Sequence, residues 1–154
     1  MEKRLIIGSD HGGFELKEAI KSHLIKGSQY EVLDAGVYDR SPSDYPPIAH
    51  RVVEGILKGG FQRGILICGT GIGMSITANR YRGIRAALCH DHYTARYSRL
   101  HNDANVLVLG GRVLGVGLAL EIVDVFLNTE FEGGRHERRL CLIEEYEESK
   151  RERS

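Results

Sequence analysis

Short apolar runs alternate with segments of helical periodicity along this chain. Five runs are continuously apolar, which is typical of a strand that is covered on both faces. Each run is followed by a turn and then by apolar residues at helical spacing. The chain therefore consists of repeated strand–helix units. The predicted strands are Leu5–Gly8, Val32–Ala35, Ile65–Cys68, Ile84–Cys89 and Asn105–Leu109.

Glycine, proline and capping residues mark the ends of the predicted helices. The first helix carries Leu16, Ile20 and Leu24 on one face and ends at Gly27. Asp91 is a good N-cap for the fourth helix. The later helices are predicted to run from Pro46 to Gly59, Met74 to Tyr81, Asp91 to Arg99, Leu114 to Leu127 and, as an additional C-terminal helix, Arg135 to Lys150.

This order of elements predicts a single α/β domain over residues 1–154. Its five strands would form a doubly wound, Rossmann-like parallel sheet with helices on both faces, which gives three layers. The common order for five such strands is 2-1-3-4-5, which places the first and third strands side by side where ligands bind. The loops Ser9–Gly13 and Cys68–Gly73 would then bring Asp10, His11 and Cys68 into one crevice.

Charge and cysteine content narrow the classes of partner. The chain has 21 basic and 21 acidic residues, so it lacks the basic excess that drives nonspecific nucleic-acid binding, and a small molecule is the expected partner. Three widely spaced cysteines without a C-x-x-C pair argue against disulfides or a zinc site and predict a reducing, cytoplasmic location. The sequence shows no signal-peptide pattern and no apolar run approaching 18 residues, so no membrane association is expected.

The most informative segment is Cys68–Gly73, which follows the third predicted strand and opens a helix. Glycines at positions 69, 71 and 73 allow backbone N–H groups to converge on a ligand. The positive end of the following helix points to the same place and favours a thiolate or another anion there. An ordinary strand-to-helix turn beside an inert core cysteine is the alternative interpretation of this segment taken alone.

Familiar glycine-loop chemistries do not fit this segment. A dinucleotide site requires G-x-G-x-x-G after the first strand, and a P-loop requires a lysine that Gly73-Met74-Ser75 lacks. A cysteine phosphatase would carry arginine at position 74, where this chain has methionine. A flavin phosphate would be a poor neighbour for Asp10. We therefore expect no cofactor and no metal.

Other polar clusters lie near strand or helix ends. His101-Asn102-Asp103 precedes the fifth predicted strand and Arg112 follows it, although a surface turn would use Asn-Asp in the same way. Arg135 and Arg139 are four residues apart and share one helical face, which suits a phosphate. A solvated basic start of a helix is the alternative meaning of that pair.

Taken together, these segments resemble the ribose-5-phosphate isomerase type B family and the related galactose-6-phosphate isomerase subunits. The resemblance implies a flavodoxin-like fold and a cofactor-free aldose–ketose isomerase of the pentose phosphate pathway, acting on ribose 5-phosphate and ribulose 5-phosphate. It also implies a homodimer, or a dimer of dimers, with active sites shared between subunits. The matching segments are Ser9–His11, Asp44–Pro46, Cys68–Gly73, Ala78–Arg80, Gly83–Ala86, His101–Val106 and Gly133–His136.

The resemblance also assigns roles by position. Cys68 matches the general base and His101 the residue that assists ring opening. Some relatives use a glutamate where this chain has Met74, so the base here would be the cysteine. Thr70 is a candidate oxyanion donor beside the loop that holds the enediolate, Gly69, Gly71, Ile72 and Gly73. The other matched positions are the sugar contacts Asp10, His11, Tyr45 and Asn102 and the phosphate clamp Arg112, Arg135 and Arg139.

Two alternatives remain open from the sequence. The first keeps the chemistry and replaces the pentose with a 6-phosphohexose such as allose or galactose 6-phosphate. The second is a non-catalytic phosphosugar-binding module on the same scaffold, which would show no isomer exchange.

Overall fold

In the computed structural model, which describes residues 3–27 and 29–154, the centre of the molecule is a five-stranded sheet in which every pairing is parallel. Apolar residues of β1, β3 and β5 point alternately to its two faces, as expected of strands buried on both sides. The strands are β1 (Lys3–Ser9), β2 (Tyr30–Asp34), β3 (Arg63–Cys68), β4 (Ala86–Leu88) and β5 (Val106–Gly110).

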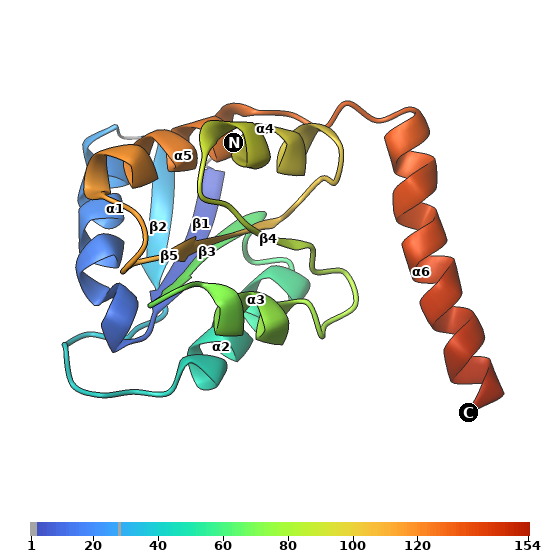
Figure 1. The fold of residues 1–154 in the computed structure, drawn as a ribbon, viewed down its shortest axis with the longest axis horizontal. Helices are drawn as coiled ribbons and strands as arrows, with labels where there is room; N and C mark the ends of the chain where they lie inside the picture. Colours follow the sequence, from blue (N-terminus) through green and yellow to red (C-terminus); the bar gives the residue numbers. More distant parts are fainter. Residues whose placement is uncertain (1–2, 28) are drawn as a thin grey trace.

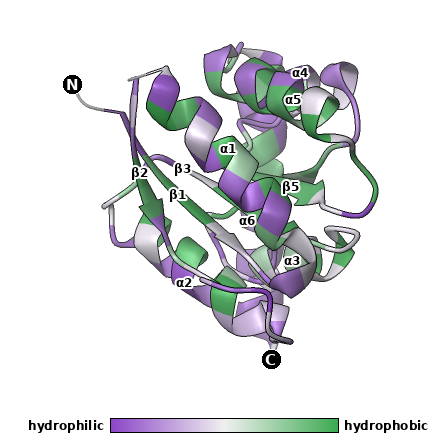
Figure 2. Cartoon of the chain, turned by 90° about the vertical axis from the view of Figure 1, so that its left-hand side faces the viewer, coloured by the Kyte–Doolittle hydropathy of each residue, from purple (hydrophilic) through white to green (hydrophobic). Residues whose placement is uncertain are grey.

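Helices cover both faces of this sheet (Figure 1), which confirms the three-layer α/β prediction. One core lies between the sheet and α1 (Phe14–Lys26), α4 (His92–Leu100) and α5 (Val116–Asn128). A second core lies between the sheet and α2 (Tyr45–Leu57) and α3 (Ile72–Ala78). Hydrophobic and hydrophilic residues alternate along these helices (Figure 2), and the buried hydrophobic residues pack against the sheet. The short 3-10 helix η1 (His11–Gly13) joins β1 to α1.

The order of the strands corrects one part of the sequence prediction. The observed order is β2-β1-β3-β5-β4, so the last two strands are exchanged relative to the predicted 2-1-3-4-5. All five residues of β5 are buried, whereas β4 is only three residues long and half-buried. The more apolar and longer strand takes the interior position, and the short strand lies at the edge, where fewer backbone groups need partners.

Helix boundaries agree with the capping signals where a side chain provides the cap. Asp91 caps α4 by accepting a hydrogen bond from the Thr94 backbone N–H at 2.7 Å. The third helix differs from its prediction, because it begins at Ile72 and ends at Ala78. Gly71 precedes it with φ at 83°, a left-handed conformation that starts the helix two residues earlier than the apolar pattern indicated.

A buried lysine fixes the segment that follows β2. Lys17 of α1 is fully buried, and its Nζ lies 2.8 Å from each carboxylate oxygen of Asp34 and also donates to the Val37 carbonyl. Burial works against ionisation of Asp34, but hydrogen bonds from Lys17 and Lys21 outweigh it and lower the pKa of this carboxyl. Losing one partner of such a buried pair typically costs about 3–5 kcal/mol. The pair therefore anchors the start of residues 35–44, which reach the candidate site.

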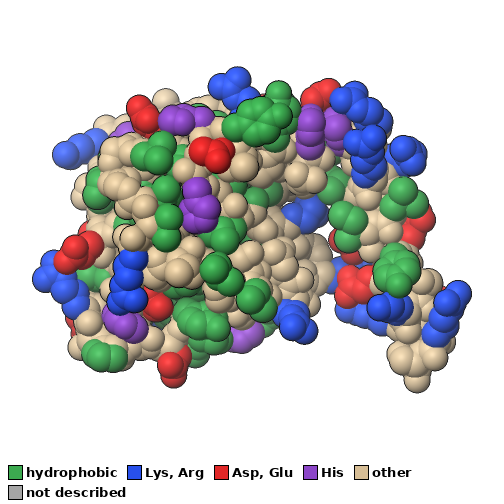
Figure 3. Space-filling view, in the orientation of Figure 1, with side chains coloured by type: hydrophobic (Ala, Val, Ile, Leu, Met, Phe, Trp, Pro, Cys, Tyr) green, Lys and Arg blue, Asp and Glu red, His purple; other side chains and the backbone are tan. Residues whose placement is uncertain are grey.

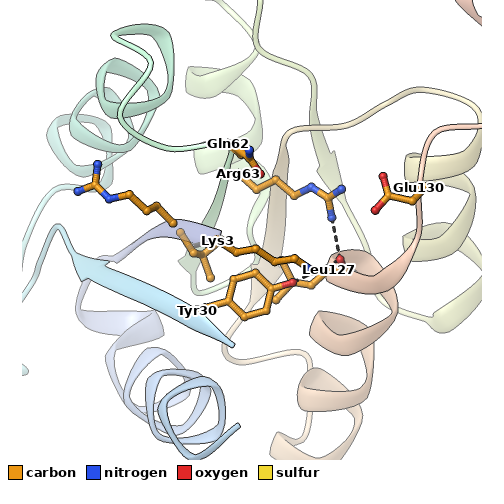
Figure 4. A pocket seen from close by; sticks show the side chains of 8 residues that line it. Lys3, Tyr30, Gln62, Arg63, Leu127 and Glu130 are labelled. Atoms are coloured by element: carbon orange, nitrogen blue, oxygen red, sulfur yellow. Dashed lines mark hydrogen bonds between the residues drawn. The ribbon is translucent and has the colours of Figure 1, made fainter. Parts of the chain in front are cut away.

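The pocket shown in Figure 4 lies at the amino-terminal edge of the sheet. There Arg63 Nη1 donates to the carbonyls of Phe126 and Leu127, both at 3.0 Å. These carbonyls belong to the last turn of α5, which has no intrahelical donors for them. The arginine therefore has a structural role as the cap of α5.

The C-terminal helix α6 (Arg135–Arg153) extends away from the sheet (Figure 1). It is linked back through Arg82, which forms ion pairs with Glu144 at 3.2 Å and with Glu148. Three large apolar side chains remain exposed on it, with Leu142 at 49%, Ile143 at 62% and Tyr146 at 65%. An apolar surface of this kind on a projecting helix is typical of contact with another chain.

Candidate active site

The loops that follow β1, β3 and β5 are joined at the carboxyl-terminal edge of the sheet. The Asp10 backbone N–H donates to the Ile67 carbonyl at 3.2 Å, and the Gly111 N–H donates to the Cys68 carbonyl at 2.8 Å. A side chain at Gly111 would force the backbone apart, because its Cβ would lie 2.6 Å from the Gly12 carbonyl oxygen. These contacts confirm the predicted meeting of the first and third loops and add the loop after β5.

Cys68 lies at the centre of this junction, at the end of β3. Its Sγ accepts a hydrogen bond from the Gly71 backbone N–H at 3.2 Å, and the residue is only 5% exposed. The bond requires the left-handed turn at Gly71, where a Cβ would lie 2.5 Å from Leu88 Cδ1. The sulfur therefore faces a backbone donor at the start of α3.

The glycine loop is enclosed by two side chains from other elements. The ring of Tyr45 packs on Gly73 so closely that a Cβ there would lie 2.5 Å from Tyr45 Cζ. At the start of the loop, Arg112 Nη1 lies 3.1 Å from the position that a Cβ of Gly69 would take. Thr70 and Ile72 are exposed at the rim, with the Thr70 hydroxyl oxygen accepting from the Ile72 N–H at 3.2 Å.

Asp10 and His11 are held in fixed orientations beside this loop. Asp10 is 7% exposed and caps η1 by accepting from the Gly13 N–H at 3.2 Å. His11 Nδ1 accepts from the Ser43 backbone N–H at 3.1 Å, and the His11 N–H donates to Ser43 Oγ at 3.1 Å. Because Nδ1 is an acceptor, a neutral His11 carries its proton on Nε2, which can donate to a ligand.

A pocket next to these residues also contains Arg40, which the sequence prediction did not include. The pocket is lined by residues from three loops and the first turn of α1, and Arg40 forms an ion pair there with Glu15 at 3.1 Å. Ser43 was missed as well, because an isolated polar residue in a long loop gives no signal of its own. The lining residues are His11, Gly12, Glu15, Leu16, Arg40, Gly111 and Arg112.

The remaining predicted site residues form a second cluster around His101. His101 is the C-cap of α4, and its ring stacks on that of His136 with centroids 3.9 Å apart and planes 13° apart. Its Nε2 lies 3.8 Å from Glu132 Oε2, and Arg135 Nη1 lies 3.8 Å from Glu132 Oε1. Figure 3 shows histidine and basic side chains together at the start of α6. Asn102 follows His101 directly in the chain, and Arg139 lies four residues after Arg135; both residues are exposed.

His136 and Glu132 received no role in the sequence analysis. His136 is 3% exposed, and burial together with the positive charges of His101 and Arg135 lowers the pKa of its imidazole. The ligand atoms of His101, Glu132 and His136 all lie within 4.8 Å of one another, which makes them a group that could hold a metal ion. The sequence argument against metal considered only cysteine spacing and could not detect this group.

The two clusters lie at opposite edges of the sheet within one chain. Cys68 is paired with Gly110 at the end of β5, whereas His101 precedes Val106 at the beginning of β5. The four residue steps from Val106 to Gly110 span about 13 Å along the strand. One chain therefore holds the predicted base, sugar loop and Arg112 at one edge, and His101, Asn102, Arg135 and Arg139 at the other.

The fold and its carboxyl-edge site define an α/β enzyme with a buried thiol beside a glycine loop. The family model described as Ribose/Galactose Isomerase matches residues 5–143. The chain belongs to this family and is an isomerase. None of the helices within residues 3–27 and 29–154 combines the length and the apolar character that spanning a bilayer requires.

Individual relatives align with this chain over almost their full lengths. Ribose-5-phosphate isomerase B of Escherichia coli (strain K12) is 47% identical over 141 residues, which cover 92% of this chain and 94% of the relative. D-erythrulose-4-phosphate isomerase of Pectobacterium atrosepticum is 43% identical over 147 residues, covering 93% and 94%. The structure of Clostridium thermocellum ribose-5-phosphate isomerase B superimposes with a TM-score of 0.92 at 51% identity, covering 95% of this chain and 98% of that one.

Proposed function

We propose that this isomerase interconverts ribose 5-phosphate and ribulose 5-phosphate through an enediolate, with Cys68 as the general base. The main observation behind this proposal is the hydrogen bond from the Gly71 N–H to Cys68 Sγ, because a base at this position needs a donor for its thiolate. The relatives that share this fold and bear the name ribose-5-phosphate isomerase B support the choice of substrate.

The chemistry requires one base to move a proton between two neighbouring carbons. Cys68 takes the proton from C2 of the open-chain aldose, the electron pair forms the C1–C2 double bond, and the carbonyl oxygen at C1 becomes negative. Backbone N–H groups of Gly69–Gly73 and the Thr70 hydroxyl are the donors for this oxygen. After a proton passes from the C2 oxygen to the C1 oxygen, the thiol returns its proton to C1 and the ketose forms.

The cluster around His101, contributed by another subunit, provides the groups for ring opening and for phosphate binding. His101 acts as acid–base group at the ring oxygen of the cyclic sugar, a role for which an imidazole is suited near neutral pH. Arg112 from one chain and Arg135 and Arg139 from its partner hold the phosphate. Asp10, His11, Tyr45 and Asn102 contact the sugar hydroxyls. Binding energy from the distant phosphate positions the reacting carbons.

A homodimer, or a dimer of dimers, is therefore part of the proposal. The two clusters lie at opposite edges of one sheet, so a complete site needs a second chain. The exposed apolar residues of α6, which begins with Arg135, support a contact that places this cluster on another subunit. The cytoplasmic location stays a prediction from the cysteines, all three of which are free thiols.

Incubation with ribose 5-phosphate in heavy water tests the proposed reaction. We expect ribulose 5-phosphate to accumulate and deuterium to appear at C2 of the recovered aldose, because the intermediate exchanges its proton through the thiol. Allose 6-phosphate and galactose 6-phosphate in parallel incubations test the hexose alternative by the same readout. Binding of ribose 5-phosphate with no isomer or isotope exchange would instead establish a non-catalytic module and contradict the proposal.

Arg135→Ala is expected to raise KM for ribose 5-phosphate by roughly tenfold or more while changing kcat less, because a charged hydrogen bond to the phosphate is lost. Arg138→Ala is the matched control, since Arg138 is exposed on the same helix turn and has no assigned role. Steady-state kinetics with inorganic phosphate as competitor measures both effects. Equal KM values for the two variants would remove Arg135 from the phosphate clamp.

A further inference from the structure

The group formed by His101, Glu132 and His136 has the composition of a zinc site. Two imidazoles and one carboxylate are a common set of three protein ligands for zinc, with a fourth position left to water. Their ligand atoms lie within 4.8 Å of one another. Bonds of about 2.0–2.1 Å to a tetrahedral ion would place these atoms about 3.3 Å apart. Because the rings of His101 and His136 are stacked with planes 13° apart, the His101 ring has to turn out of the stack for both imidazoles to reach one ion.

His136 offers a ring nitrogen that could bind an ion. His136 is 3% exposed, and its Nε2 has no hydrogen-bond partner among residues 3–27 and 29–154. A buried polar atom without a partner is costly and is uncommon without a bound water or ion. An imidazole nitrogen that is buried in this way and has no partner among the described residues is available to coordinate a metal ion.

The other two ligands are free to move toward the ion. Glu132 and His101 have side chains 46% and 35% exposed, so neither is locked by packing. Glu132 already lies 3.8 Å from both His101 and Arg135, and its carboxylate offsets the positive charge of the arginine near the ion. The backbone N–H of Glu132 donates to the Leu100 carbonyl at 3.1 Å, which keeps this glutamate next to the end of α4.

We propose that His101, Glu132 and His136 bind a divalent transition-metal ion of the zinc type, and that the bound ion inhibits the isomerase. The inhibition rests on the proposed function, because coordination occupies the imidazole of His101 that opens the sugar ring. Metal and sugar phosphate then compete for one group, and the ion is an inhibitor rather than a cofactor. The metal binding itself does not depend on the isomerase activity.

Titration of the metal-stripped, full-length protein with Zn²⁺ and Co²⁺ tests the site. We expect one ion per chain, and a Co²⁺ spectrum without the thiolate charge-transfer band that binding at Cys68 would produce. Glu132→Gln is expected to weaken binding at least about tenfold, since it replaces an anionic ligand by a neutral amide. Glu130→Gln is the matched control, because Glu130 is exposed two residues earlier and lies outside the group.

His136→Asn gives a second test of the same ligand set. It is expected to weaken metal binding as Glu132→Gln does. If the variant of the buried His136 does not fold, the variant of the exposed Glu132 alone tests the ligand set. Unchanged affinity in Glu132→Gln, or a thiolate band in the Co²⁺ spectrum, would overturn the proposed site. Zn²⁺ that binds at this site without slowing ribose 5-phosphate turnover would overturn the inhibition alone. A protein without isomerase activity would leave the binding result standing.

Discussion

Cys68→Ser is expected to fold as the parent protein does and to lose isomerase activity by about a thousandfold or more. A hydroxyl is a far weaker acid than a thiol, so the introduced serine would not ionise near neutral pH and could not take the proton from C2. The loss of a positioned general base typically costs about 10²–10⁴ in rate. The measurement is kcat for ribose 5-phosphate, with circular dichroism and gel filtration to show that fold and assembly are preserved.

The matched control for this variant is Cys141→Ser. It makes the same chemical change at an exposed cysteine of α6, far from the glycine loop in the sequence. We expect its turnover to stay close to that of the parent. Near-normal turnover in Cys68→Ser would reject the cysteine as base and would direct attention to another group at the carboxyl edge.

His101→Asn is expected to slow turnover of cyclic ribose 5-phosphate by about 10²–10⁴, because no acid–base group remains at the ring oxygen. An open-chain analogue, which needs no ring opening, should lose far less. Comparison of kcat for the two substrates measures this difference. Equal losses on both substrates would remove the ring-opening role from His101.

Mixing the two inactive variants tests whether sites are shared between subunits. When Cys68→Ser and His101→Asn chains are dissociated and reassociated together, each mixed dimer contains one site with an intact thiol from one chain and an intact imidazole from the other. Activity is then expected to recover to about one quarter of the parent value, since half of the dimers are mixed and each has one of two sites complete. Sites formed within single chains would show no recovery.

Much of the fold was readable from the sequence because burial imposes a pattern. The continuous apolar runs located all five strands, and Asp91 located the start of α4, since local chemistry determines both. The exchange of β4 and β5 was not predictable from order along the chain. It depends on which strand, the buried β5 or the half-buried β4, gains more from two neighbours. That comparison is a property of the assembled sheet.

The candidate site was predictable to a similar extent. The loops after neighbouring parallel strands had to meet, so Asp10, His11 and Cys68 could be grouped before the structure was known. The division of the predicted set between two sheet edges follows from the same topology, because α4 carries His101 back to the amino edge before β5 begins. Grouping His101 with Cys68 by family roles alone does not use this constraint. The hydrogen bond from the Ser43 N–H to His11 and the stacking of His101 on His136 are contacts between distant segments. No local sequence pattern indicates them.

The separation of Cys68 from His101 by the length of a strand has a consequence for how the enzyme responds to its own abundance. With sites completed between subunits, an isolated chain is inert, and dimers in dilute solution form in proportion to the square of the chain concentration. Metabolic flux through the enzyme would then rise more steeply than linearly as synthesis begins, and would level off to a linear response once most chains have paired.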